Sequence, residues 1–362
     1  MAGQLSVQPW ANARTEYSDN LELCPGYDQV VTGVIADLGF HAERADEQDV
    51  ISLTPTLRSS RYDSNEPLNS NDQLLSGTWS RNSERGTWRV DGGLTHDSTL
   101  TSELEISGLV QTRKRRLLRY LSPSYRYDIS SRTSVTTDVN YTSVKYKDAL
   151  YAGLVNYDYG RVDMGVSYQS SERVTLTETI YTARMNAPQI GNRTDTVGAQ
   201  LQISSAVTEA WDGTFAFGAY SNHEGIYGAD RAGGLLNINL HEIDEKGEWR
   251  IGLNRSIDPS GTGVMVQRDQ LEVTREQRFD ERWSMRASAY WVVNKDLQKI
   301  AVSQDRRFRS TEIRVSRIID PNWSMDAAYS YAWQRYAEQP AFAESNTLML
   351  GIHYSGRRRT GS

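Results

Sequence analysis

The chain reads as a series of segments in which apolar and polar side chains alternate. Segment 322–336 shows the pattern best, because apolar or aromatic residues occupy the odd positions from Trp323 to Trp333, and small or polar residues occupy the even positions between them. A period of two places each set on its own face of a β-strand. The apolar face is rich in aromatic residues, and the other face carries Asp, Arg, Asn, Ser and Gly. This is the reverse of a soluble barrel with a packed interior, and it is typical of a barrel that lies in lipid around a wet lumen.

Segments of this kind predict eighteen strands. Each has roughly ten or more residues, which is enough for a tilted strand to cross a bilayer. We therefore expect an all-β fold, a transmembrane antiparallel up-and-down β-barrel. The predicted strands are 4–17, 29–45, 49–63, 71–83, 86–100, 114–129, 133–147, 155–169, 173–186, 194–207, 210–223, 232–244, 247–257, 264–279, 282–295, 305–319, 322–336 and 345–355.

Two kinds of connector alternate between these strands. Tight polar turns follow the even-numbered strands, as at Asp46-Glu47-Gln48 and Asp320-Pro321-Asn322, and longer irregular connectors follow the odd-numbered ones. Polar turn formers of this length favour hairpins. Short periplasmic turns on one rim and longer extracellular loops on the other are typical of outer-membrane barrels. We expect residues 1–362 to form one barrel domain with both termini on the short-turn side, and residues 355–362 to form a disordered tail.

Tryptophan recurs at equivalent places beside the tight turns. A ring of Trp at one level of a barrel is an interfacial girdle. The alternative is that these residues fill a core, but their recurrence at the start of successive upward strands favours the girdle. The predicted girdle residues are Trp88, Trp211, Trp249, Trp283 and Trp323.

The residues opposite in phase to the apolar face are predicted to line the lumen. Arginines and carboxylates recur there two residues apart, which supports either salt bridges that stabilise the wall or a polar track for a hydrated solute. Inward aromatic residues such as Trp10, Tyr120 and Tyr220 could anchor loops or stack on sugar rings. The predicted charged lumen residues are Arg89, Asp91, Arg126, Asp128, Asp138, Arg161, Asp163, Arg250, Glu272, Arg286, Glu312, Arg314 and Asp326.

Composition supports a hollow barrel more than a solid one. The chain has 362 residues, 38% of them hydrophobic, and a mean hydropathy of −0.61, which is low for a globular core of this size. The 20 Tyr and 9 Trp argue against disorder. No apolar stretch is long enough for a transmembrane helix, which does not exclude a barrel. No signal peptide is present, and we expect the sequence to be that of the mature protein.

The residues that enzymes and metal sites need are scattered. Cys24 is the only cysteine, and the five histidines show no metal-ligand spacing such as HExxH. The Ser-Asp-Asn at 18–20 lacks the partner motifs that would make it a β-lactamase element. The net charge of −6 gives no reason to expect nucleic acid binding. We expect neither an enzyme nor a cofactor or metal site.

Several runs resemble a known family. They are TEYSDNLEL at Thr15–Leu23, VVTGVIADLGFHAER, ISLTPTLRSSRYD, and the middle stretch SPSYRYDISSRTSVTTDVNYTSVKY. The sequence resembles the outer-membrane β-barrel proteins of bacterial exopolysaccharide operons, the exosortase-associated or EpsL-like polysaccharide export barrels. The resemblance implies a passive outer-membrane channel for a secreted exopolysaccharide, in a Gram-negative bacterium. It also implies outer-membrane lipid, the polysaccharide and periplasmic or inner-membrane synthesis and export proteins as partners.

Two other functions fit the same barrel. A general or small-solute diffusion porin would need a connector folded into the lumen, and the third long connector, about 101–113, has the length to do this. A scaffold barrel that sheathes a partner protein is the other alternative. An eighteen-stranded barrel is wide enough for an aqueous channel in each case.

Overall fold

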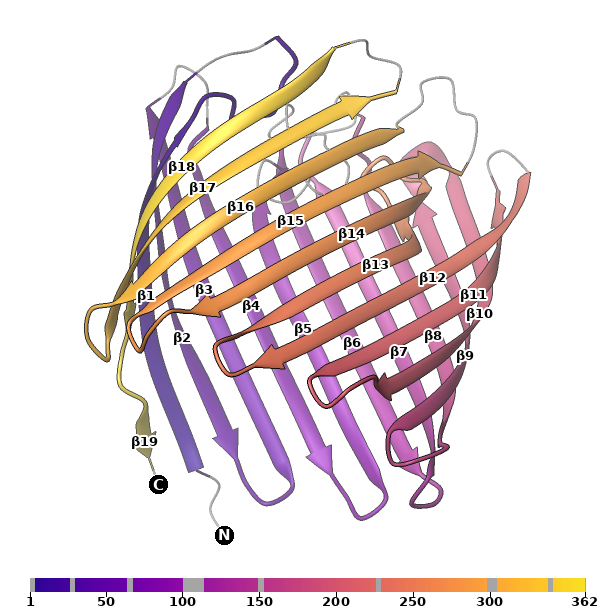
Figure 1. The fold of residues 1–362 in the computed structure, drawn as a ribbon. Coiled ribbons are helices and arrows are strands. Elements are labelled where there is room, and N and C mark those ends of the chain that lie inside the picture. Colours follow the sequence, from indigo (N-terminus) through magenta and orange to yellow (C-terminus); the bar gives the residue numbers. More distant parts are fainter. Residues whose placement is uncertain are drawn as a thin grey trace.

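The computed structural model describes residues 4–26, 30–63, 68–99, 114–148, 153–225, 229–297, 305–337 and 341–361. Eighteen long strands form one antiparallel sheet that closes on itself (Figure 1). Their bounds are β1 (Gln4–Ser18), β2 (Val31–Ala45), β3 (Asp49–Asp63), β4 (Ser70–Asn82), β5 (Gly86–Ser98), β6 (Arg115–Asp128), β7 (Thr133–Tyr146), β8 (Tyr157–Gln169), β9 (Val174–Ala187), β10 (Asn192–Ala206), β11 (Trp211–Glu224), β12 (Ala229–Asp244), β13 (Gly247–Pro259), β14 (Met265–Arg278), β15 (Trp283–Asp296), β16 (Arg306–Ile318), β17 (Trp323–Tyr336) and β18 (Phe342–Ser355).

Each strand pairs with the next in the chain, and β1 closes the ring against β18. The closing register runs from Trp10 opposite Ser355 to Ser18 opposite Thr347. The prediction of a closed up-and-down barrel of eighteen strands is confirmed, with strand ends within three residues of the predicted ones. No helix among the described residues is long and apolar enough to cross a membrane.

The turns after the even strands are short because an Asp, Ser or Thr side chain in each accepts backbone N–H groups of the same turn. The Asp46 carboxylate accepts the backbone N–H groups of Asp49 at 2.8 Å and Gln48 at 3.1 Å, and these bonds lower the pKa of Asp46. The Asp280 carboxylate accepts those of Arg282 and Trp283 at 2.7 Å, with the same effect on its pKa. Both termini lie at this rim (Figure 1).

The C-terminal tail differs from the expectation of disorder. Residues Arg359–Gly361 form a short strand, β19, which pairs with Leu5–Val7 of β1. The reason is an open edge, since β18 ends opposite Trp10 while β1 continues down to Gln4. The backbone N–H of Gly356 donates to the Pro9 carbonyl at 2.8 Å and guides the tail onto that edge.

The two faces of the wall differ as the alternation predicts. On β17 the outward Trp323, Met325 and Tyr329 are 41–46% exposed, whereas the inward Asp326 is 7% exposed. The same alternation around the ring leaves an apolar belt outside and mostly polar side chains inside, so the described strands enclose no central apolar core. Many of the buried apolar residues form two clusters toward the longer loops.

Candidate functional site

The interior face can be followed by register, because residues directly opposite each other share a face. Tyr181 packs in a cluster inside the barrel, and it opposes Asp163, which opposes Asp138. Continuing this register around the ring places every charged residue predicted to line the lumen on the inward face. The five predicted girdle tryptophans lie on the outer face at the starts of β5, β11, β13, β15 and β17, near the short-turn rim.

Most of the arginines predicted to line the lumen are paired with a carboxylate two residues away on the same strand. Nε of Arg89 lies 2.7 Å from Oδ2 of Asp91, Nε of Arg126 lies 2.9 Å from Oδ1 of Asp128, and Nη2 of Arg161 lies 2.6 Å from Oδ1 of Asp163. The other predicted pair, Arg314 and Glu312, has 3.1 Å between Nε and Oε1. Their positive charges are therefore largely neutralised within the wall.

A longer polar chain ties the barrel closure together. Arg314 on β16 also pairs with Asp326 on β17, and Asp326 contacts His353 on β18. The Nδ1 of His353 lies 3.0 Å from the Asn12 side-chain oxygen on β1. Sequence phase identified Arg314 and Asp326 but missed His353, which becomes their neighbour only once β18 pairs with β17.

Two further inward arginines take partners that the prediction omitted from the site. Arg250 hydrogen-bonds to Glu248, two residues away, and Nη1 of Arg286 lies 3.4 Å from Oε1 of Glu276 on the neighbouring strand. The recurring spacing of two residues was the available signal for Glu248. Of the predicted carboxylates, Asp138 and Glu272 have no ion-pair partner within the described ranges.

One sector of the interior carries few charges, which are Asp212, Glu224 and Arg231 near the strand ends. The inward side chains of β9 to β12 are mostly Thr, Ser, Gln, Asn and Gly. They bond to one another, as in Thr196 Oγ1 to Asn222 Oδ1 at 2.7 Å and Gln202 Nε2 to Ser204 Oγ at 3.1 Å. The lumen wall therefore combines a sector of paired charges with a sector of neutral hydrogen-bonding groups.

The inward aromatic residues lie flat over glycines on the neighbouring strand. Trp10 opposes Gly39, Tyr120 opposes Gly93 and Tyr220 opposes Gly233. A Cβ atom on any of these glycines would come within 2.7 Å of the ring. The rings therefore cover bare backbone and protrude little into the lumen. Tyr62 on Gly33 and Tyr181 on Gly198 repeat the arrangement.

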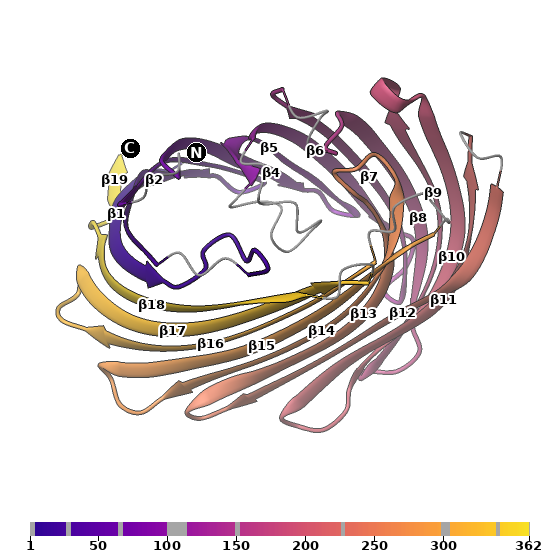
Figure 2. The ribbon, with the colours of Figure 1, turned by 90° about the horizontal axis from the view of Figure 1, so that it is seen from above.

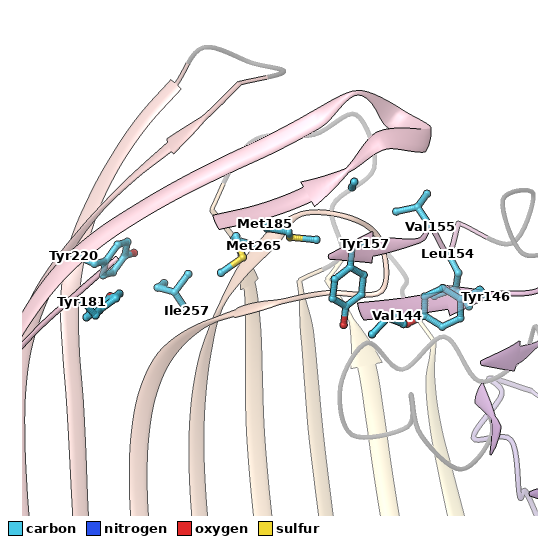
Figure 3. Close-up of a cluster of buried hydrophobic side chains, with 11 residues drawn as sticks. Val144, Tyr146, Leu154, Val155, Tyr157, Tyr181, Met185, Tyr220, Ile257 and Met265 are labelled. Carbon is cyan, nitrogen blue, oxygen red and sulfur yellow. The ribbon is translucent and has the colours of Figure 1, made fainter. Parts of the chain in front are cut away.

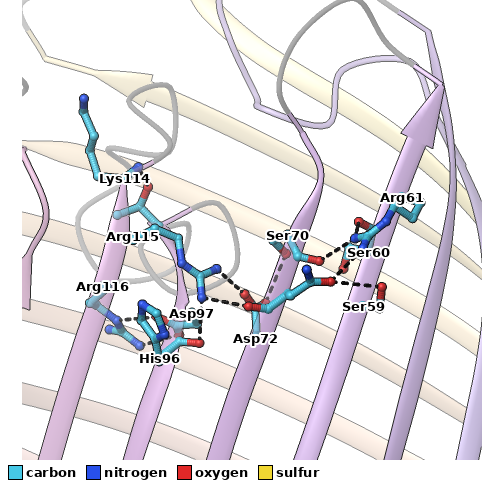
Figure 4. A network of polar contacts seen from close by, with 12 residues as sticks. Ser59, Ser60, Arg61, Ser70, Asp72, His96, Asp97, Lys114, Arg115 and Arg116 are labelled. Atoms are coloured by element: carbon cyan, nitrogen blue, oxygen red, sulfur yellow. Dashed lines mark hydrogen bonds and ion pairs between the residues drawn. The ribbon is translucent and has the colours of Figure 1, made fainter.

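Buried ion pairs hold the long-loop ends of β4 to β6 (Figure 4). Arg116 binds Asp97 through two hydrogen bonds of 3.0 and 2.9 Å, and both side chains are buried. Nη1 of Arg115 lies 2.6 Å from Oδ1 of Asp72 on β4. Neither pair was predicted, because each joins residues that are neighbours only across strands.

The hairpin end between β13 and β14 turns into the barrel. We call residues 257–265 the inward hairpin. Its Ile257 and Met265 pack with Val144, Met185 and other buried residues of β7 to β11 (Figure 3). The backbone N–H of Val155 donates to the Gly261 carbonyl at 2.8 Å. The hairpin thus covers the interior side of β11 and reaches the ends of β7 to β10.

The tip of the inward hairpin depends on a glycine. Gly263 has φ = 82°, in the left-handed region, and a Cβ there would lie 2.3 Å from Val155 Cγ2 and 2.9 Å from Ile190 Cδ1. Its carbonyl accepts the Asn192 side-chain amide at 2.9 Å. Backbone conformation and space both require glycine at this contact.

A second segment narrows the mouth from another side. We call residues 19–26, which follow β1, the inward loop, and Figure 2 shows it in indigo inside the ring of strands. Leu23 is 1% exposed and packs on Val292, Phe308 and Ala343. The Gln334 side-chain amide donates to the Leu23 carbonyl at 2.6 Å. The Asn20 amide donates to the backbone carbonyl of Glu344 at 3.0 Å.

Two segments that the sequence analysis did not single out narrow the described part of the lumen. The connector 101–113 lies outside the described residues, whereas the inward hairpin and the inward loop are described and narrow the lumen at the long-loop rim. Apolar residues in an otherwise polar connector, such as Leu23, were the signal that could have found them.

Comparison with known proteins identifies the class by fold. No protein-family model and no curated protein matches the chain. The outer-membrane protein OpdK of Pseudomonas aeruginosa has a TM-score of 0.51 at 9% identity, over 96% of this chain and 99% of that one. OccAB2 of Acinetobacter baumannii has a TM-score of 0.52 at 10% identity, over 98% of each chain. At such identity the likeness shows the fold, that of an outer-membrane β-barrel, and the chain is placed in the bacterial outer membrane.

The resemblance to exopolysaccharide-operon barrels is wrong. The structures that match with a TM-score above 0.5 include OpdK and OccAB2, which are not polysaccharide export barrels. The runs that carried the resemblance are strand and turn patterns, which any barrel with this topology shares. Similar alternation therefore made unrelated barrels look alike in sequence.

Proposed function

We propose that this barrel is a passive diffusion channel for small hydrophilic solutes. The observation that carries the proposal is an interior lined by polar side chains and narrowed near one rim by two inward segments. A hydrated solute exchanges water for hydrogen bonds along such a wall without being held tightly, as a conduit requires. One matched structure is of OpdK with vanillate, a small molecule, and this supports the small-solute class for the proposal.

The proposed lumen face also sets an expected ion preference. Its arginines are mostly paired with carboxylates, while Asp138 and Glu272 have no ion-pair partner in the described part of the chain. Unpaired carboxylates raise the local concentration of cations. We expect cations to permeate about two to five times better than anions, a modest preference typical of a wide polar pore.

The channel is tested by solute-dependent swelling of liposomes that contain the purified barrel. Monosaccharides and amino acids should enter rapidly, and large oligosaccharides should not. A salt gradient across a planar bilayer gives the ion preference from its reversal potential. Liposomes that do not swell with any small solute would overturn the proposal.

The lumen assignment has its own test in cysteine accessibility. Single cysteines at Arg89, Arg126, Arg161, Arg250, Arg286 or Arg314, in a background with Cys24→Ser, should react with a water-soluble thiol reagent. A cysteine at outward Met325 is the matched control and should react with a lipid-phase probe instead. The opposite labelling pattern would show that the faces are reversed.

A further inference from the structure

Three arginines gather on the outer face near the long-loop ends of β16 and β17. Arg307, Arg309 and Arg335 all have exposed side chains. Arg307 and Arg335 are directly opposite each other across the two strands, and Arg309 is the next outward residue below Arg307. Like charges in directly opposed positions repel and destabilise a sheet. This arrangement calls for a counterion between them.

The described residues do not supply that counterion. No carboxylate among them lies within ion-pair distance of Arg307, Arg309 or Arg335. Two acidic residues lie near the patch. Asp305, two residues before Arg307, accepts the backbone N–H of Asp296 at 2.7 Å, and Glu344, diagonal to Arg335 by register, accepts a hydrogen bond from the Tyr331 hydroxyl at 3.1 Å.

Other outward arginines near the same rim are neutralised within the chain. Nε of Arg184 lies 2.5 Å from Oδ1 of Asp195, and Nε of Arg255 lies 2.5 Å from Oδ1 of Asp269. Asp269 is also 3.6 Å from the Lys295 Nζ. Outward arginines near the long-loop rim can therefore have acidic partners on the wall. The three arginines of β16 and β17 have none among the described residues.

Aromatic rings hold one of the three guanidinium groups in place. Arg309 lies between Trp291 and Trp333, with its Cζ 5.2 and 5.1 Å from the two ring centroids. Register places the three residues directly side by side on β15, β16 and β17. A guanidinium that stacks through its faces keeps its N–H edges for an oxygen acceptor such as phosphate.

The position of these residues along the membrane normal matches that of the lipid headgroups. On β15, Trp291 lies eight residues after Trp283, which is near the short-turn rim. At ~3.4 Å per residue the two are ~27 Å apart along the strand. A strand tilt of ~40–45° reduces this to ~20 Å along the membrane normal. That spans a thin outer membrane. Below the arginines, outward Tyr329, Ile313 and Leu348 are 44–57% exposed and offer apolar contacts for acyl chains.

We propose that this patch binds a phosphate-bearing lipid of the outer leaflet. One phosphate lies between Arg307 and Arg335 and relieves their repulsion, Arg309 donates to the same headgroup, and the acyl chains lie over the apolar belt below. Charge complementarity commits the site to an anionic lipid, since bidentate arginine contacts favour phosphate. The site is on the outer wall and does not depend on what passes through the lumen.

The test measures lipid retained by the purified barrel with native mass spectrometry. The probes are bis-phosphorylated lipid A, the same lipid with its phosphates removed, and inorganic phosphate. Wild type should retain the bis-phosphorylated form, and the double variant Arg307→Gln, Arg335→Gln should retain at least about tenfold less. Arg255→Gln, whose partner Asp269 keeps Lys295, is the matched control and should retain wild-type amounts. Heat-dependent gel mobility checks that each barrel is folded.

Three outcomes would overturn the proposal. The first is equal retention of the dephosphorylated lipid, and the second is unchanged retention by a folded double variant. The third is displacement of lipid by millimolar inorganic phosphate, which would indicate a free-anion site. Conductance of the double variant should stay at the wild-type value, so loss of lipid binding and loss of channel function can be told apart.

Discussion

The inward hairpin and the inward loop narrow the same mouth by different chemistry. The hairpin contributes Ile257 and Met265 to a cluster of eleven buried apolar residues, and its glycine tip fits against Val155. The loop contributes one buried apolar side chain, Leu23, and is held mainly by hydrogen bonds from Asn20 and Gln334.

This difference indicates which segment is fixed. Buried apolar side chains each contribute about 1.5–3 kcal/mol, whereas a hydrogen bond that exchanges with water contributes about 0.5–1.5 kcal/mol. The loop also carries a cost, because Leu23 has φ = 51°, in the left-handed region, without being glycine. We expect the hairpin to set the minimum width of the mouth and the loop to open more readily.

The largest effect should come from removing the tip of the inward hairpin. Replacement of residues 260–264 by Asn-Gly keeps β13 and β14 joined by a tight turn and takes away the contacts of Gly261 and Gly263 with the wall. Conductance should rise by about twofold or more, since the narrowest part of a pore dominates its resistance. An unchanged single-channel current would mean that the hairpin does not limit the pore.

A single methyl group at the tip should weaken the same contact. Gly263→Ala meets both an unfavourable φ and a 2.3 Å clash, whereas Gly153→Ala has a similar φ of 75° with open space around it. Gly263→Ala should lower the free energy of unfolding by about 2–3 kcal/mol, and Gly153→Ala by about 1 kcal/mol. Thermal unfolding in detergent measures both, and equal losses would show that packing at the tip adds nothing.

Releasing the inward loop should have a smaller effect on the channel. Gln334→Leu removes the hydrogen bond to the Leu23 carbonyl and the one accepted from Arg306, at a cost of about 1–2 kcal/mol to docking of the loop. We expect brief additional openings with little change in the main conductance level. Gln200→Leu, on the neutral interior sector, is the control. An equal rise of the single-channel current noise in Gln334→Leu and Gln200→Leu would argue against a movable loop.

The smallest effect should follow from disturbing the wall itself. Gly93→Ala displaces the Tyr120 ring and the Leu75 backbone carbonyl, because the new Cβ would lie 2.6 Å from the ring and 2.7 Å from the carbonyl oxygen. Gly252→Ala meets only the Asn239 amide oxygen, at 3.3 Å. If the mouth limits the current, moving Tyr120 into the lumen should lower conductance by only about 10–20%. A drop as large as the gain from hairpin removal would place the constriction in the wall.

Sequence pattern predicts the barrel well because its strands obey a local rule. A period of two predicts where the strands lie, and it predicts that Asp326 faces inward and Trp323 outward. Alternating connector lengths predict which rim carries the short turns and which the long loops. Arginine and carboxylate two residues apart, as in Arg161 and Asp163, predict ion pairs within a strand. Each of these depends only on residues close together in the chain.

The mouth was not predicted because it depends on contacts between distant segments. Gly263 meets Val155 and Asn192, and Leu23 meets Gln334. Connectors have no period that reveals such partners. The short strand β19 was not predicted for the same reason, because the open edge of β1 with which it pairs exists only after β1 has paired with β18.

The most direct test of a channel narrowed at its long-loop mouth is single-channel current with neutral polymers added to one side at a time. Small polyethylene glycols added at the short-turn side should enter the wide interior and lower the current. Polymers of the same size added at the long-loop side should be excluded and leave the current unchanged. Equal effects from both sides, or no ion current at all, would contradict the account.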